Sequence, residues 1–161
     1  MAGSILGYPY FIMGRVIHGN ERGRTMNYPT ANIALETGRV IPAYGVYSCA
    51  VLVNGEIYCG ALSIGNNPTF GDINGVRAEV HILDFSGDIY GVNIAVFLLE
   101  RVRGMKVFAD KEALMTQIGH DVLKCHEIYT RATYAEKFIK QASEIYSTIS
   151  APDIINLTQK A

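Results

Sequence analysis

GVYSCAVLVNGEIYCGALSI, residues Gly45–Ile64, is the stretch that decides the fold class. Its first half is rich in β-branched and aromatic residues, which are enriched in strands. The Asn54-Gly55 pair then interrupts the run and favours a two-residue type I′ turn, which needs positive φ at both positions. The second half, Glu56–Ile64, should therefore return antiparallel to Gly45–Val53. The stretch predicts a β-hairpin near the centre of the chain.

Four further strand-like runs flank this hairpin in the sequence. They predict strands at Tyr10–Ile17, Ala31–Leu35, Arg77–Leu83 and Val92–Leu99. Six strands with mostly hairpin connections favour a closed antiparallel barrel. Several of these strands are apolar on both faces, so we expect a helix to cover part of the outer surface.

A helix is predicted after the last strand. Asp110 is a suitable N-cap residue, and the run that follows places Leu114, Ile118 and Val122 on one helical stripe. A second amphipathic stretch, from about Tyr134 to Tyr146, is a candidate for another short helix. The more polar tail after it is expected to be loosely ordered.

The composition indicates one folded domain without a strong overall charge. The 161 residues are 49% hydrophobic and 18% charged, which suits one core and is too short for two. The 14 Lys and Arg residues nearly balance 15 Asp and Glu, giving a net charge of −1. No global field therefore recruits nucleic acid or an anionic membrane. No run approaches the roughly twenty apolar residues that span a bilayer.

The three cysteines, Cys49, Cys59 and Cys125, are an odd number without zinc-site spacing. This fits reduced thiols in a cytoplasm better than a disulfide framework. The first residues lack the basic region of a signal peptide, and no apolar core follows them. We therefore expect a cytoplasmic protein, with Cys49 and Cys59 as small buried hydrophobes in strands.

The segment between the first two predicted strands has the ingredients of a phosphate-binding loop. Gly19 and Gly23 let backbone N–H groups approach an anion closely, and Arg24 adds positive charge. The spacing matches neither a Walker A loop nor a dinucleotide fingerprint, and the loop leads to a strand rather than a helix. On these residues alone, a surface loop with glycine turns and solvated arginines is the alternative.

Pro29, Thr30 and Asn32 follow this loop. Pro29 has no N–H and fixes the angle at which the chain enters the next strand. Thr30 and Asn32 offer uncharged oxygens to a hard cation such as Mg²⁺. The pattern indicates a candidate metal site beside the phosphate loop.

Glu79 is the candidate general base. It shares a strand face with His81, in a barrel whose interior is mostly apolar, and is either a base or a solvent-facing residue at the barrel rim. His81 is most simply a hydrogen-bonded structural neighbour. Arg103 lies between the last predicted strand and the helix, where a solvated arginine is the default and a ligand contact is the alternative.

Taken together, these segments resemble the riboflavin kinase family. The resemblance extends from about Leu6 to Leu123, and its lead-in is similar to the junction before the kinase module of bacterial bifunctional riboflavin kinase/FAD synthetases. The motifs that carry it are Gly19-x-x-x-Gly23-Arg24, Pro29-Thr30-Ala31-Asn32, Gly45-Val46-Tyr47, Ile64-Gly65-x-Asn67-Pro68-Thr69-Phe70, Glu79-x-His81-x-Leu83-Asp84-Phe85 and Asp88-x-Tyr90-Gly91.

The resemblance implies a mainly β fold, a six-stranded antiparallel Greek-key barrel with a C-terminal helix. It also implies transfer of the γ-phosphate of ATP to the 5′-hydroxyl of riboflavin, giving FMN. Thr30 and Asn32 would hold Mg²⁺ and the ATP phosphates, and Glu79 would take the hydroxyl proton. The other nucleotide and flavin contacts that it implies are Gly19, Gly23, Arg24, Pro29 and Arg103.

We expect a kinase domain over residues 6–131 and a C-terminal helical extension and tail over 132–161. An N-terminal FAD synthetase module is expected in the full-length protein if the likeness to the bifunctional enzymes holds. The alternative function is a β-barrel that binds flavin without turning it over. Thr30, Asn32 and Glu79 together favour the kinase, because a flavin carrier needs neither a metal site nor a base.

Overall fold

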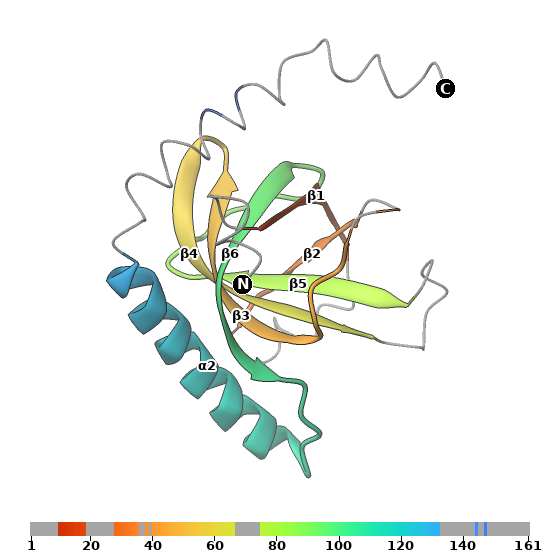
Figure 1. The fold of residues 1–161 in the computed structure, drawn as a ribbon, viewed down its shortest axis with the longest axis vertical. Helices are drawn as coiled ribbons and strands as arrows, with labels where there is room; N and C mark the ends of the chain where they lie inside the picture. The colour runs from red at the N-terminus through yellow and green to blue at the C-terminus, as the bar shows by residue number, and fades with distance from the viewer. Residues whose placement is uncertain are drawn as a thin grey trace.

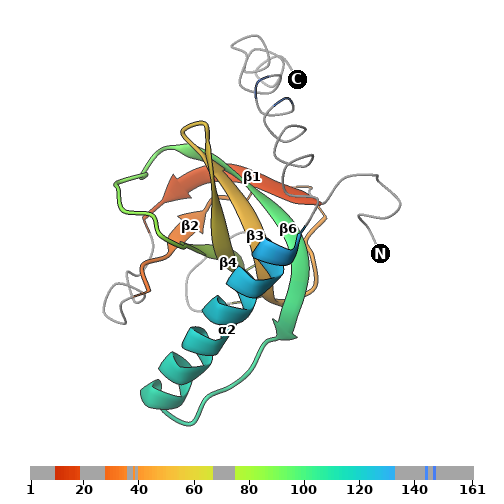
Figure 2. The same ribbon diagram turned by 90° about the vertical axis from the view of Figure 1, so that its left-hand side faces the viewer.

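The computed structural model describes residues 10–18, 28–35, 38, 40–66, 75–132, 144 and 147 of the chain. Strands and one long helix make up this part of the molecule (Figures 1 and 2). In chain order they are β1 (Phe11–Ile17), β2 (Ala31–Ile33), β3 (Gly45–Val53), β4 (Glu56–Asn66), β5 (Val76–Ile82), β6 (Asn93–Gly104) and α2 (Lys111–Arg131).

The strands form a closed barrel in the order β1-β2-β5-β4-β3-β6, and every neighbouring pair is antiparallel. Strands β3, β4 and β5 are consecutive neighbours, and β6 returns to lie beside β3. This arrangement of a fourth strand beside the first is a Greek key. The predicted six-stranded antiparallel Greek-key barrel with a C-terminal helix is confirmed.

The β3–β4 hairpin forms as its turn chemistry requires. Its ladder runs from Gly45 opposite Ile64 to Val53 opposite Glu56. At the turn, Asn54 has a φ of 52° and Gly55 a φ of 85°, which is the double positive φ of a type I′ turn. The predicted hairpin is therefore confirmed, and its first strand begins and ends at the predicted residues, Gly45 and Val53.

The barrel interior is an apolar core to which every strand contributes alternate residues. Among its members are Ile12, Val16, Ile33, Cys49, Val51, Leu62, Ile64, Ala78, Val80, Ile94 and Val96. Strand β3 is buried at every position because α2 covers part of its outer face, as Figure 2 shows. Ser48 donates a 2.8 Å hydrogen bond to the carbonyl oxygen of Cys125 on α2. The expected helical cover of an apolar outer face is confirmed.

Three elements are longer than the sequence indicated, one of them β4, which continues past Ile64 to Asn66. Strand β2 is shorter, because it ends at Ile33 and not at the predicted Leu35. Strand β6 continues to Gly104, so Arg103 lies within a strand rather than in a connection. Helix α2 begins after Asp110, whose carboxylate accepts a 2.7 Å hydrogen bond from the Ala113 N–H, and it ends at Arg131. The buried positions of its barrel face are Asp121, Cys125 and Ile128, whereas Leu114, Ile118 and Val122 are only half-buried.

The three cysteines are buried free thiols. Burial raises the pKa of Cys59 to about 11 and that of Cys125 to about 12, and it raises the pKa of Cys49 as well. These groups stay protonated near neutral pH and act as small apolar residues, as predicted for Cys49 and Cys59.

Of the helical residues that the structure describes, no segment combines the length and apolarity needed to cross a membrane. The stretch Tyr134–Tyr146 and the tail lie outside the described residues, apart from Glu144 and Ser147.

Candidate active site

Asn32 of β2 lies directly opposite Glu79 of β5 in their antiparallel ladder. Opposed residues of such a ladder point to the same face, with Cβ atoms about 4.5–5.5 Å apart. Their neighbours Ile33, Ala78 and Val80 belong to the interior core. Asn32 and Glu79 therefore project together from the outer surface of the barrel. The structure brings the candidate base and a candidate metal ligand into contact range.

This pair belongs to a longer row that crosses five strands. Glu79 is opposite Ser63 of β4, Ser63 is opposite Val46 of β3, and Val46 is opposite Arg103 of β6. We call these five residues, Asn32, Glu79, Ser63, Val46 and Arg103, the outer row. Neighbouring strands are about 4.8 Å apart, so three strand spacings, roughly 14 Å, separate Glu79 from Arg103. Ser63 directly precedes the Ile64-Gly65 motif but was not itself marked in the sequence, and only the pairing of β4 with β5 sets it opposite Glu79.

Thr30 and Asn32 retain oxygens that a cation can use. Both residues are half-buried, and neither side chain forms a hydrogen bond or ion pair with another described residue. In the described part of the chain, no three His, Cys, Asp or Glu residues cluster to form a metal cage. Mg²⁺ commonly takes one or two protein oxygens and completes its shell with water and substrate phosphates. The pair of uncharged oxygens beside the Glu79 carboxylate fits that mode of binding.

Glu79 is accessible enough to meet a substrate. Its side chain is 36% exposed, and one carboxylate oxygen lies 3.8 Å from Nη1 of Arg77 on the same strand face. That separation exceeds a hydrogen bond, and surface ion pairs contribute little. The carboxylate is therefore not locked by this partner and can accept a proton from a group bound over the outer row.

His81 continues the face of Glu79 along β5. Its Nδ1 lies 2.8 Å from the carbonyl oxygen of Pro29. Its ring meets the ring of Tyr28 edge-on, with centroids 5.5 Å apart. The prediction that His81 is a hydrogen-bonded structural neighbour is confirmed, and its partner is the segment that carries Thr30.

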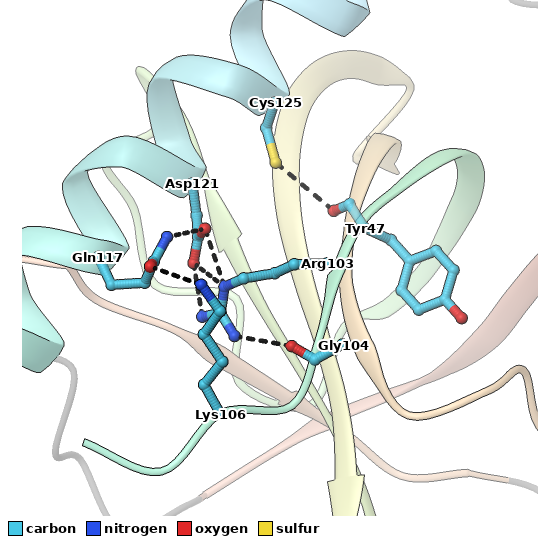
Figure 3. A network of polar contacts seen from close by, with 7 residues as sticks. All are labelled: Tyr47, Arg103, Gly104, Lys106, Gln117, Asp121 and Cys125. Carbon is cyan, nitrogen blue, oxygen red and sulfur yellow. Dashed lines mark hydrogen bonds and ion pairs between the residues drawn. The ribbon is translucent and has the colours of Figure 1, made fainter.

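At the other end of the outer row, Arg103 is clamped to α2 (Figure 3). Its Nη2 lies 2.6 Å from Oδ2 of Asp121, and Nε lies 3.0 and 2.9 Å from the two carboxylate oxygens. Its Nη1 donates to the Gly104 carbonyl oxygen, Gln117 donates to Asp121, and Lys106 donates to Gln117. The Arg103 and Asp121 side chains are only 14% and 6% exposed. The default expectation of a solvated arginine is wrong, because a helix carboxylate pairs with it.

Gly19, Gly23 and Arg24 lie outside the described residues, so their expected nucleotide contacts stay predictions. The strand that leads to them, β1, ends at Ile17, which is the register partner of Asn32. On the other side of that segment the described chain resumes at Tyr28, and the exposed Pro29 and then Thr30 follow. Both ends of the predicted phosphate loop thus meet the barrel beside Asn32.

The model of the flavokinase family, described as riboflavin kinase, matches residues 6–129. The chain belongs to the riboflavin kinase family. The bifunctional riboflavin kinase/FMN adenylyltransferase of Bacillus subtilis (strain 168) is 41% identical over 123 residues, covering 75% of this chain and 39% of that protein. The chain spans 39–41% of the length of the curated relatives that it matches first.

Two solved structures share the fold of this family member. The riboflavin kinase of Trypanosoma brucei superimposes with a TM-score of 0.58 at 25% identity, covering 90% of this chain and 91% of that one. A Streptococcus pneumoniae protein described as a macrolide-efflux protein has a TM-score of 0.71 at 39% identity. That alignment covers 78% of this chain and 41% of the other.

Proposed function

We propose that this riboflavin kinase family domain transfers the γ-phosphate of ATP to the 5′-hydroxyl of riboflavin, giving FMN and ADP. The observation that carries the proposal is the register of Asn32 against Glu79. It sets a carboxylate that can take a proton beside an uncharged side-chain oxygen that no other described residue engages, on the outer face of the barrel. A barrel that only bound flavin would need neither group.

In the proposed reaction, Glu79 accepts the proton of the riboflavin 5′-hydroxyl as its oxygen bonds to the γ-phosphorus. The bond from that phosphorus to the bridging oxygen of ADP breaks, and ADP leaves. Phosphoryl transfer depends on positioning and charge neutralisation more than on covalent chemistry. Fixed groups on a rigid strand pair are suited to that task.

Thr30 and Asn32 are the proposed ligands of Mg²⁺, which when bound would neutralise phosphate charge. Their half-buried oxygens are not engaged by other described residues, which supports this assignment. Gly19, Gly23, Arg24 and Pro29 are proposed to line the nucleotide phosphates.

Arg103 is proposed to contact the flavin at the far end of the outer row. Its ion pair with Asp121 fixes the guanidinium there, about three strand spacings from Glu79. That separation suits a substrate with a flat ring system at one end and a reacting hydroxyl at the end of a polyol chain.

We further propose that the kinase domain occupies residues 6–131, followed by a helical extension and tail over 132–161. Because the relatives are bifunctional and this chain spans about two fifths of their length, an N-terminal FAD synthetase module is proposed for the full-length protein. Riboflavin and ATP, rather than nucleic acid or membrane, are its proposed partners, and the cytoplasm is its proposed location.

The test is to incubate the chain with riboflavin, ATP and Mg²⁺, to separate the flavins by chromatography, and to run Glu79→Gln alongside. Loss of a positioned base lowers turnover about 10²- to 10⁴-fold, so FMN should form in the wild type and be nearly absent in the variant. Riboflavin binding should be retained by both. Bound riboflavin without FMN in the wild type would instead establish the flavin-binding alternative, and equal turnover in both proteins would remove Glu79 from the mechanism.

A further inference from the structure

The peptide that carries Thr30 is held by a side chain rather than by the sheet. The ladder between β2 and β5 runs from Ile33 opposite Ala78 to Ala31 opposite Val80. Continuing the register by one residue would set Thr30 opposite His81. The preceding Pro29 has no N–H with which to extend the ladder. The His81 side chain reaches the Pro29 carbonyl oxygen at 2.8 Å instead.

The direction of this hydrogen bond follows from its acceptor. A carbonyl oxygen only accepts, so the His81 Nδ1 must carry the proton. His81 also contacts the Tyr28 ring, and the Tyr28 hydroxyl lies close to α2, only 3.4 Å from where a Cβ on Gly119 would be. His81 therefore links the segment Tyr28–Thr30 to β5, the strand that carries both His81 and Glu79.

We propose that His81 is a positioning residue of the phosphoryl-transfer site. By donating from Nδ1 to the Pro29 carbonyl, it sets the orientation of the Pro29–Thr30 peptide. The orientation of that peptide in turn determines the position of the Thr30 side-chain oxygen relative to Glu79. The inference rests on the proposed function. It predicts that His81 affects the binding of the nucleotide and not the binding of the flavin.

Two substitutions distinguish the effect of the His81 hydrogen-bond donor from the effect of its aromatic ring. His81→Asn keeps a donor, because the asparagine Nδ2 can take the place of the histidine Nδ1, whereas His81→Phe keeps an aromatic ring beside Tyr28 without a donor. One hydrogen bond is worth about 1 kcal/mol, so His81→Phe should raise the KM for ATP roughly fivefold and leave the KM for riboflavin unchanged. His81→Asn should restore most of the loss. Equal behaviour of the two variants, or parallel changes in both KM values, would overturn the proposal.

A third variant guards against the case in which His81→Phe does not fold. If His81→Phe does not fold by circular dichroism, His81→Gln replaces it, because its longer side chain carries the amide to the region of Nε2. It should then resemble a donor-free variant rather than His81→Asn. Wild-type affinity of His81→Gln for Mg·ADP, measured by calorimetry, would count against the proposal.

A readout independent of turnover distinguishes failure of the inference from failure of the proposed function. The chain has four histidines, and ¹⁵N NMR of the labelled wild type reports which ring nitrogen of each carries the proton. We expect the His81 resonance, assigned by its absence from His81→Asn, to show protonation at Nδ1. Protonation at Nε2 alone overturns the inference even if FMN forms. Absence of FMN from the wild type with Nδ1 protonated would reject the kinase and, with it, the role given to His81.

Discussion

The two ends of the outer row are built differently. At the β6 end, Arg103 and Asp121 are nearly buried and satisfy each other in a bidentate ion pair. At the β2 end, Thr30 and Asn32 are half-buried and make no polar side-chain contact with other described residues. The first end uses its polar groups to fix the helix on the barrel. The second leaves its polar groups unengaged by other described residues, which suits the proposed metal site.

The largest effect is expected from breaking the clamped end. Asp121→Ala leaves the Arg103 guanidinium without its carboxylate in a nearly buried position, and loss of one partner of a buried pair destabilises by about 3–5 kcal/mol. Urea denaturation should show this loss. Glu127→Ala, which removes an exposed carboxylate of the same helix, should leave the midpoint nearly unchanged. Similar midpoints for the two variants would mean that the Arg103–Asp121 pair does not hold the helix.

An intermediate effect is expected at the open end. Asn32→Ala removes a proposed ligand of Mg²⁺ without creating a cavity or an unpaired buried group. It should raise the KM for ATP about tenfold, equivalent to roughly 1.4 kcal/mol, while the KM for riboflavin and the stability change little. Asn93→Ala, at an exposed position of β6, is the matched control and should alter neither constant. An equal rise in both KM values for Asn32→Ala would argue against a metal role.

The smallest effect is expected between the two ends, at Gly119 of α2. A glycine inside a helix is about 1 kcal/mol less favourable than alanine, and the added Cβ would meet the Tyr28 hydroxyl at 3.4 Å, an ordinary contact distance. Gly119→Ala should therefore stabilise the fold by up to about 1 kcal/mol in thermal unfolding. Destabilisation would show that α2 and Tyr28 are packed too closely to accept a methyl group.

The barrel could be predicted largely from local signals. The Asn54-Gly55 turn fixes the β3–β4 register by itself, and runs of β-branched and aromatic residues mark the other strands. The end of β6 was missed because charged residues after Leu99 resembled a connection. Its partner strand β3, with register shifts at Val46/Tyr47 and Ser48/Cys49, lies far away in the sequence, so no local pattern records it.

The residues of the candidate site stood out in the sequence, but their arrangement did not. Glu79, Thr30 and Asn32 stood out by residue type and motif. The register that sets Asn32 against Glu79 arises only when β2 joins β5 across the barrel. Arg103 was interpreted as solvated because its partner, Asp121, is on a helix whose orientation the sequence does not encode locally. Ser63 was missed because only the pairing of β4 with β5 sets it opposite Glu79.

The shortness of β2 has a thermodynamic consequence. It meets β1 at two register pairs and β5 at three, so the barrel is closed there by fewer main-chain contacts than at the β3–β4 hairpin. Segments with few such contacts open locally at lower free energy than the global unfolding. A ligand that binds the closed form opposes that opening by mass action. Nucleotide bound at Thr30 and Asn32 would therefore stabilise the closed barrel against local opening at β2.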